Sequence, residues 1–145
     1  MLISRKTRYA LKGLFQLAAS QSIEPVKVSK LAEAQGIPPR FLELIFTELK
    51  QAGFVESRRG NEGGYLLTSP PEMITVGEVI RFIQGENILA DSERKETSTF
   101  GSYALNRLWK GASDAVSETC DTTTLADLVN MEMENRQQYI PNYTI

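Results

Sequence analysis

The sequence has no histidine and only one cysteine, Cys120, among its 145 residues. The residue types that build a Cys/His zinc site, or a Ser–His or Cys–His nucleophile pair, are therefore missing. One cysteine also excludes a disulfide bond within the chain. Catalysis by carboxylates or lysines stays formally open, but no such constellation stands out, and we do not expect an enzyme.

Long apolar runs are missing too, and no stretch approaches the roughly 18 apolar residues of a membrane span. The first ten residues, MLISRKTRYA, lack the apolar segment and the small-residue cleavage site of a signal peptide. Hydrophobic residues make up 41% of the chain, which supports an ordinary globular core. We therefore expect a cytoplasmic protein without a membrane partner.

Charge is divided unevenly along the chain, whose formal net charge is −2. Residues 1–69 hold ten Lys and Arg against six Asp and Glu, a net charge of +4. Residues 70–145 hold the other six bases and twelve acids, a net charge of −6. A basic first half and an acidic second half indicate a division of labour.

The spacing of apolar residues in the first half predicts three helices, over about residues 4–20, 28–35 and 39–52. The connection between the second and the third is the short turn Gly36–Pro39, whose prolines suit the first positions of a helix. Two helices joined by so short a turn are typical of a helix-turn-helix. The stripe that the third helix is expected to bury consists of Phe41, Leu42, Ile45, Phe46 and Leu49.

The stretch SRRGNEGGYLL, Ser57–Leu67, follows these helices. The segments FVESR and YLLTS on either side of its glycines are predicted to be two short strands. A hairpin at this point makes a winged fold, whose tip reaches DNA beside the recognition helix. Glycines there permit positive φ and a close backbone approach, while arginines supply cations for a minor groove or for phosphate. The expected wing residues are Arg58, Arg59, Gly60, Gly63 and Gly64. The alternative is an ordinary Gly-rich hairpin with solvated arginines.

Taken together, these segments resemble the Rrf2 family of bacterial transcription regulators. The matching motifs are RYAL in the first helix, F-L-E in the third, R-G-x-x-G-G-Y in the wing and P-x-x-I-T-x-G-E-V-I after it. The resemblance is dense over residues 1–85 and weaker through a long helix and the TTLADL segment at 123–128. It implies a winged-helix dimer that binds a palindromic DNA operator.

The resemblance also raises the question of a cofactor. Several members of the family hold an iron–sulfur cluster through three cysteines before the dimerisation helix, while others hold none and respond to a protein partner or another signal. The matching region here, residues 86–109, contains no cysteine. Cluster irons are normally held by thiolates, sometimes with histidine. Carboxylates such as Asp91, Glu93 and Glu96 are hard ligands that suit sulfide-bridged iron poorly. We therefore expect no cofactor and no metal.

The acidic half begins with a further helix that ends at Gly85. Thr75 and Glu78 are predicted to form its capping box, and Ile74 and Val79 a hydrophobic staple. The polar segment that follows has no period and is predicted to be a flexible loop.

A long helix is predicted from about residue 101 to about residue 119, with a heptad-like apolar seam. Its expected dimer-interface residues are Leu105, Leu108, Trp109, Ala112, Ala115 and Val116. The alternative is an amphipathic helix that packs on its own domain. Thr124 and Asp127 are predicted to cap a last short helix.

The third helix is expected to enter the major groove of DNA. Arg40 could donate to guanine or to phosphate, and Glu43 could accept from cytosine N4. The alternative for Glu43 is a solvated acid near a helix N-terminus. Leu44, where the family often has a polar residue, could meet a thymine methyl group or simply pack. The other expected DNA-binding residues are Arg5, Arg8, Tyr9 and Phe41, the first three of them at or near phosphates.

The predicted fold class is mainly α. A winged helix-turn-helix domain is expected over residues 1–85, followed by a loop at the sensor position over residues 86–100. The dimerisation helix and a short C-terminal helix are expected over residues 101–135, and a tail over residues 136–145. A homodimer on double-stranded DNA is expected, and a protein or small-molecule effector stays open. The rival is a module that sequesters a partner protein and has lost operator binding. A basic first half and a complete wing argue against it.

Cys120 follows the predicted long helix. A lone cysteine is more often an inert small apolar residue than a redox sensor. The neighbouring carboxylates of Glu118 and Asp121 are expected to raise the pKa of its thiol and to make it less reactive.

Overall fold

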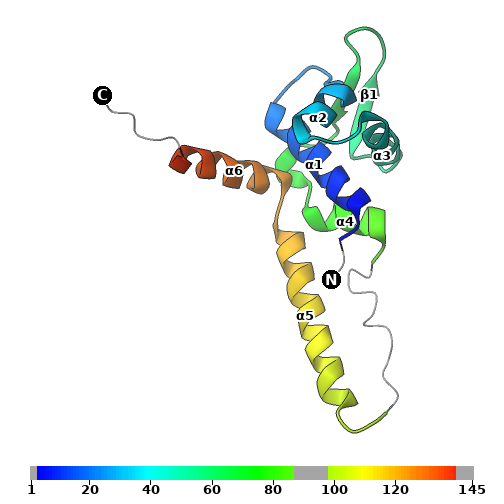
Figure 1. The fold of residues 1–145 in the computed structure, drawn as a ribbon, viewed down its shortest axis with the longest axis vertical. Coiled ribbons are helices and arrows are strands. Elements are labelled where there is room, and N and C mark those ends of the chain that lie inside the picture. The colour runs from blue at the N-terminus through cyan, green and yellow to red at the C-terminus, as the bar shows by residue number, and fades with distance from the viewer. Residues whose placement is uncertain (1–2, 87–97, 140–145) are drawn as a thin grey trace.

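The computed structural model describes residues 3–86 and 98–139, with side chains described as far as residue 137. The mainly helical, winged architecture predicted from the sequence is confirmed (Figure 1). The elements are α1 (Arg5–Ser20), α2 (Val28–Gln35), α3 (Pro39–Gln51), β1 (Val55–Arg58), β2 (Gly64–Leu67), the 3-10 turn η1 (Pro71–Met73), α4 (Val76–Gln84), α5 (Ser102–Thr122) and α6 (Leu125–Tyr139). Over the described ranges, no helix is long and apolar enough to span a membrane.

Helix α1 lies at the centre of the domain and packs against α2, α3, α4 and α6. Its buried face, which includes Ala10 and Leu14, meets the buried stripe of α3 in one hydrophobic core. Gly13 allows α1 to come close to α3, because a Cβ there would collide with the ring of Phe46. The core therefore fixes the position of α3 from behind and leaves its opposite face to solvent.

The helix caps that the sequence predicts are present in the structure. Thr75 and Glu78 form a capping box at the start of α4, with N–O distances of 3.2 and 3.3 Å. Thr124 and Asp127 cap α6 in the same reciprocal way, at 2.9 and 3.0 Å. Gly36 ends α2 in the left-handed conformation that the short turn requires, with φ 65°.

The wing is a two-stranded antiparallel hairpin in which Val55 pairs with Leu67 and Arg58 with Gly64. Val26 forms an isolated antiparallel bridge with Tyr65 of β2, through backbone hydrogen bonds of 2.8 and 2.9 Å. The Tyr65 ring packs edge-on against Phe46, with 5.2 Å between ring centroids. The tyrosine of the G-G-Y motif thus anchors the wing to α3.

Helix α5 is fixed to the domain at its C-terminal end. Arg81 of α4 forms an ion pair with Asp121 of α5. Backbone bonds of 2.9 Å join Val76 to Thr123 and Leu125 to Ile74. The rest of α5 extends away from the domain, and α6 projects in another direction (Figure 1). The helix runs to Thr122, slightly further than the sequence predicts.

Two sequence expectations need correction. Phe41 was expected in the buried stripe of α3, but its side chain is 47% exposed. At about 100° per residue, Phe41 lies roughly 90° from the middle of the stripe, at its edge. Helix α6 continues to Tyr139, so the first residues of the predicted tail are helical. Most of the predicted loop, residues 87–97 with Asp91, Glu93 and Glu96, and the end of the tail, residues 140–145, lie outside the described residues.

Candidate nucleic-acid interface

The solvent face of α3 carries the side chains expected to read DNA. Arg40, Glu43, Leu44 and Thr47 are all exposed on it. The Arg40 guanidinium lies 5.5 Å from the centroid of the Phe41 ring, within the range of a cation–π contact. The Thr47 hydroxyl donates to the backbone carbonyl of Glu43 at 2.9 Å. This face therefore combines a cation, a carboxylate and apolar groups.

The N-terminal turns of α1 lie beside α3. Arg5, Lys6 and Tyr9 of α1 line one open groove of about 380 Å³ together with residues of α3, among them Phe41 and Leu44. Lys6 forms an ion pair of 2.6 Å with Glu48 across this groove. Arg5 and Arg8 are exposed, and no ion pair within the described ranges holds either of them. Their charges remain available to an anionic partner.

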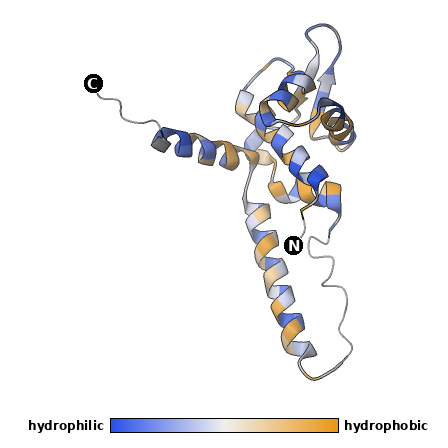
Figure 2. Cartoon of the chain, viewed as in Figure 1, coloured by the Kyte–Doolittle hydropathy of each residue, from blue (hydrophilic) through white to orange (hydrophobic). Residues whose placement is uncertain are grey.

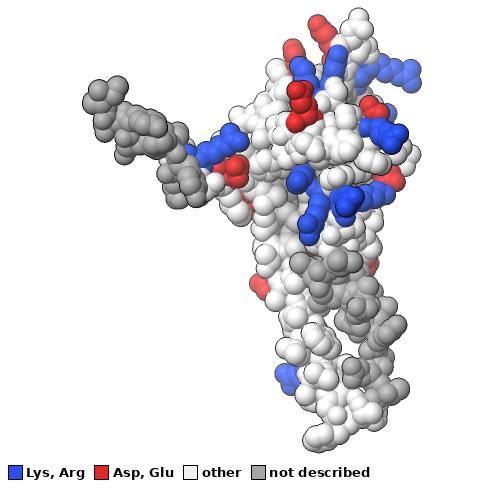
Figure 3. Space-filling view, viewed as in Figure 1, with Lys and Arg blue, Asp and Glu red and all other residues white. Residues whose placement is uncertain are grey.

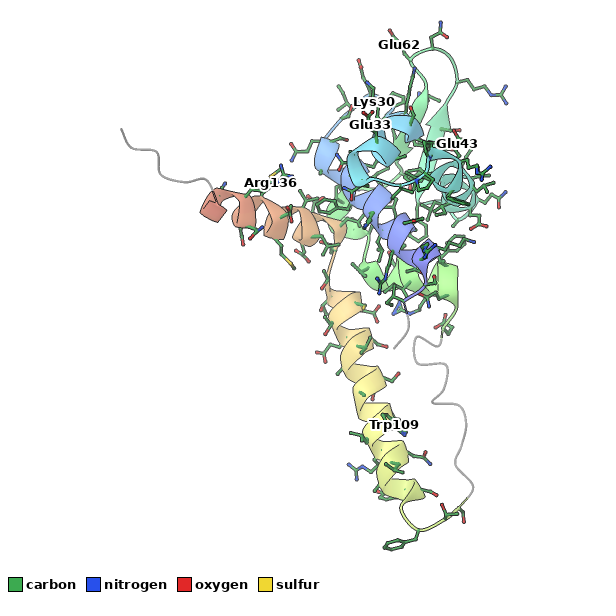
Figure 4. The ribbon with its side chains drawn as sticks, in the orientation of Figure 1. Lys30, Glu33, Glu43, Glu62, Trp109 and Arg136 are labelled. Carbon is green, nitrogen blue, oxygen red and sulfur yellow. The ribbon has the colours of Figure 1, made fainter. Side chains whose placement is uncertain are left out.

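The wing presents its cations differently from what the sequence alone suggests. Arg58 donates to the carboxylate of Glu56 on the same strand at 3.2 Å. Arg59 is exposed and has no ion pair among the described residues. Glu62 lies at the tip of the wing, as Figure 4 shows. Arg59 is therefore the freer of the two cations expected to contact DNA.

Glycines shape the tip of the wing. Gly60 has φ 107°, which favours glycine, and its carbonyl accepts from the backbone N–H of Gly63 at 2.9 Å. Gly63 does not have positive φ, but a Cβ there would collide with the carbonyl of Arg58. Gly64, with φ 156°, approaches the backbone of Val26 in the same manner. The expected close backbone approach is present at Gly63 and Gly64.

Charged side chains gather on one part of the surface. Figure 3 shows Lys and Arg side chains, with some Asp and Glu among them, over the part of the chain that contains α1, α3 and the wing, whereas the visible surface of α5 carries few charges. Helix α3 and the wing lie toward the side of the domain away from α6 (Figure 1), and the N-terminal turns of α1 lie beside α3. One face of the domain thus brings together a helix that can enter a major groove and cations that can hold phosphate.

Comparison with known proteins agrees with this geometry. The chain matches the model of the Rrf2 family, described as iron-dependent transcriptional regulators, over residues 3–131. The chain belongs to the Rrf2 family.

Its relatives are regulators of transcription. The HTH-type transcriptional regulator CymR of Bacillus subtilis is 34% identical over 144 residues, which is 97% of this chain and 98% of the relative. The putative HTH-type regulator Rv1287 of Mycobacterium tuberculosis is 37% identical over 134 residues, 88% of this chain and 81% of the relative. This Rrf2 protein is a DNA-binding transcriptional regulator and not an enzyme.

Solved structures of the family share the fold. The structure of CymR, the global cysteine regulator of B. subtilis, has a TM-score of 0.80 at 34% identity, over 90% of this chain and 98% of the other. The structure of T. potens IscR has a TM-score of 0.77 at 31% identity, over 94% and 91% of the two chains.

A second surface of the Rrf2 chain is apolar. On α5 the side chains of Leu105, Leu108 and Trp109 are exposed. Ala112 and Ala115 are exposed as well, and Val116 is half-buried. Figure 2 shows hydrophobic residues along the part of α5 that extends from the domain, and Figure 4 labels Trp109 on it. Within the described ranges, the part of the seam from Leu105 to Ala115 is not covered by its own domain.

The side chains of this Rrf2 protein do not fit an iron–sulfur cluster. The sequence has one cysteine and no histidine. Cys120 lies near the C-terminal end of α5, about 27 Å along the helix from Ser102, where the helix begins. In the described part of the chain, no three His, Cys, Asp or Glu side chains come together to hold a metal ion. Thiolates cannot be supplied in the number that a cluster needs.

Cys120 is half-buried beside the ion pair that ties α5 to α4. Burial raises the pKa of its thiol, the charge of Asp121 raises it further, and the nearby Arg81 guanidinium opposes this. The expected direction is confirmed and Asp121 contributes to it, but Glu118 is not among the causes, and burial, which neighbouring residues in the sequence cannot reveal, is the larger cause.

Proposed function

We propose that this Rrf2 regulator acts as a homodimer on a palindromic operator and does so without an iron–sulfur cluster. The observation that carries the proposal is the pairing of two uncovered surfaces on one chain. One is the exposed face of α3, flanked by cations of α1 and the wing. The other is the exposed apolar seam of α5.

On DNA, α3 enters the major groove with its N-terminal residues first. Arg40 donates to guanine or to phosphate, and Glu43 accepts from a cytosine amino group. Arg5 and Arg8 at the start of α1 hold phosphates, which position the domain without reading sequence. Arg59 reaches the neighbouring minor groove or its phosphates. Support for these roles comes from the exposure of all five side chains on α1, α3 and the wing.

The dimer forms through α5. Bulky side chains, Leu105, Leu108 and Trp109, occupy the N-terminal half of the seam, and small ones occupy the C-terminal half. In an antiparallel pair whose register sets Leu108 against Ala115 of the partner, a large side chain meets a small one and the distance between the helices stays even. A parallel pair would set large against large and leave voids at the small end, which cost stability. A two-fold dimer of this kind presents two α3 helices to two half-sites.

The absence of suitable ligands supports regulation without a cluster. Three thiolates are not present anywhere in the chain, and Cys120 lies at the far end of α5 from the sensor position. The effector is then a protein or a small molecule rather than bound iron and sulfide.

Light scattering and anaerobic metal analysis test these points together. The purified protein should be colourless, contain no stoichiometric iron or sulfide, and have twice the mass of one chain. It should also retain specific fragments from a genomic DNA pool in a gel-shift assay. A brown preparation with stoichiometric iron and sulfide overturns the cluster-free proposal. A dimer that retains no fragment favours a module that sequesters a partner protein.

A further inference from the structure

The described residues leave most of the apolar part of the reading face uncovered. Leu44 is 66% exposed. It lies roughly 150° around α3 from the middle of the buried stripe. Leu44 is not part of the hydrophobic core, which meets α3 on the opposite side. A large apolar side chain at the centre of a surface flanked by cations must gain its partner from outside.

Its neighbours on the face are also apolar where they meet solvent. Phe41, three residues before Leu44, is exposed at the edge of the same surface. The Thr47 hydroxyl is directed back along the helix to the carbonyl of Glu43, so its methyl group is what it offers outward. In the first two turns of α3, Arg40 and Glu43 supply the exposed hydrogen-bonding side chains next to this apolar centre.

We propose that Leu44 recognises the 5-methyl group of a thymine in each operator half-site. The proposal rests on the proposed function, because it requires α3 to lie in the major groove. The thymine methyl is the apolar group on the major-groove edge of the natural base pairs, and phosphates surround it at the rim. The protein face is complementary to this arrangement: its apolar centre can meet the methyl group, and the cations of Arg5 and Arg40 beside it can meet the phosphates.

The expected effect follows from the size of one methyl group. Loss of the methyl should weaken binding about fourfold in each half-site, which is about 0.8 kcal/mol. A symmetric dimer contacts two half-sites, so replacement in both should weaken binding about 15-fold. The change should be nearly independent of salt, because no phosphate contact is altered.

The probes come from a duplex pool with a randomised core, selected on the wild-type protein. In the selected duplex each thymine is then replaced in turn by uracil, which lacks only the methyl group. Titrations at one salt concentration compare the wild type with Leu44→Ala. Met73→Ala is the matched control, because Met73 is 68% exposed and lies on η1, which packs against α6. Thermal melts followed by circular dichroism establish that each variant is folded.

Wild type and Met73→Ala should lose about 15-fold in affinity when one symmetric thymine pair becomes uracil, and Leu44→Ala should lose nothing at that position. A wild type that binds its selected duplex but tolerates uracil everywhere overturns the role of Leu44 and leaves the proposed function intact. A half-site without thymine does the same. A protein that enriches no sequence at all overturns the proposed function itself.

Discussion

The dimer seam on α5 can be tested by replacing one apolar side chain with a charged one, Leu108→Glu. Leu108 is 58% exposed in the single chain. It precedes Trp109, which lies in the part of α5 that extends from the domain (Figure 4). Burial of a whole leucine contributes about 1.5–3 kcal/mol, so the exposed part contributes about 1–2 kcal/mol in each protomer. Two copies then stabilise the dimer by about 2–3 kcal/mol.

Glutamate removes this contribution and adds a second cost. Two carboxylates must leave water in an apolar seam, at several kcal/mol for each ion unless the dimer dissociates. The combined loss of at least about 5 kcal/mol raises the dissociation constant of the dimer more than about a thousandfold. Leu108→Ala lacks the buried charge and should lose only the burial contribution.

Light scattering after size exclusion, at a series of protein concentrations, measures the effect. Leu108→Glu should give the mass of one chain where the wild type gives twice that mass. Asn106→Glu adds the same charge roughly 160° away around α5 and should remain dimeric. If Leu108→Glu stays dimeric over the same concentrations, α5 is not the interface.

Three further outcomes are expected. Arg59→Ala should weaken operator binding by about 1–3 kcal/mol in titrations at fixed salt, while Glu62→Ala at the same tip should not weaken it. If Arg59→Ala binds the operator as tightly as the wild type, the wing does not contribute to DNA binding. Glu43→Ala should lower the ratio of specific to non-specific affinity by up to about 1–3 kcal/mol and raise non-specific affinity slightly, and a mutant with the full wild-type ratio would make Glu43 a solvated acid. Because burial and Asp121 raise the pKa of Cys120, iodoacetamide should alkylate this thiol more slowly at pH 8 than it alkylates free cysteine, and the rate should increase as the pH rises. The thiol of the Asp121→Asn variant should be alkylated faster than that of the wild type, and identical rates would contradict the charge effect.

The sequence by itself determined the features that depend on neighbouring residues. Caps such as Thr75 with Glu78 need only a short spacing, because the bonds that they make are local. The wing was predictable from the same kind of evidence: Gly60 and its neighbours permit a turn that other residues resist. The single cysteine and the lack of histidine are read from the sequence without any structure.

Only the tertiary structure decided which side chains the core leaves uncovered. Periodicity shows that α3 has an apolar face, but the width of the buried stripe depends on what α1 brings against it. That packing leaves Phe41 exposed, and it leaves Leu44 outside the hydrophobic core. The ion pair of Lys6 with Glu48 joins residues far apart in the chain and has no signature in their spacing.

The end of the chain illustrates the same limit. Helix α6 has almost no amphipathic pattern beyond its first turns, so periodicity cannot find its end. Its length follows from helix-forming residues and from a contact between Glu132 and Arg136 at 3.6 Å on its surface. Its first turn, in contrast, is held by Leu125, which is completely buried in the domain core. Sequence patterns report a local preference, whereas burial is a property of everything that packs around a residue, and it is burial that separates the core of this regulator from its two free surfaces.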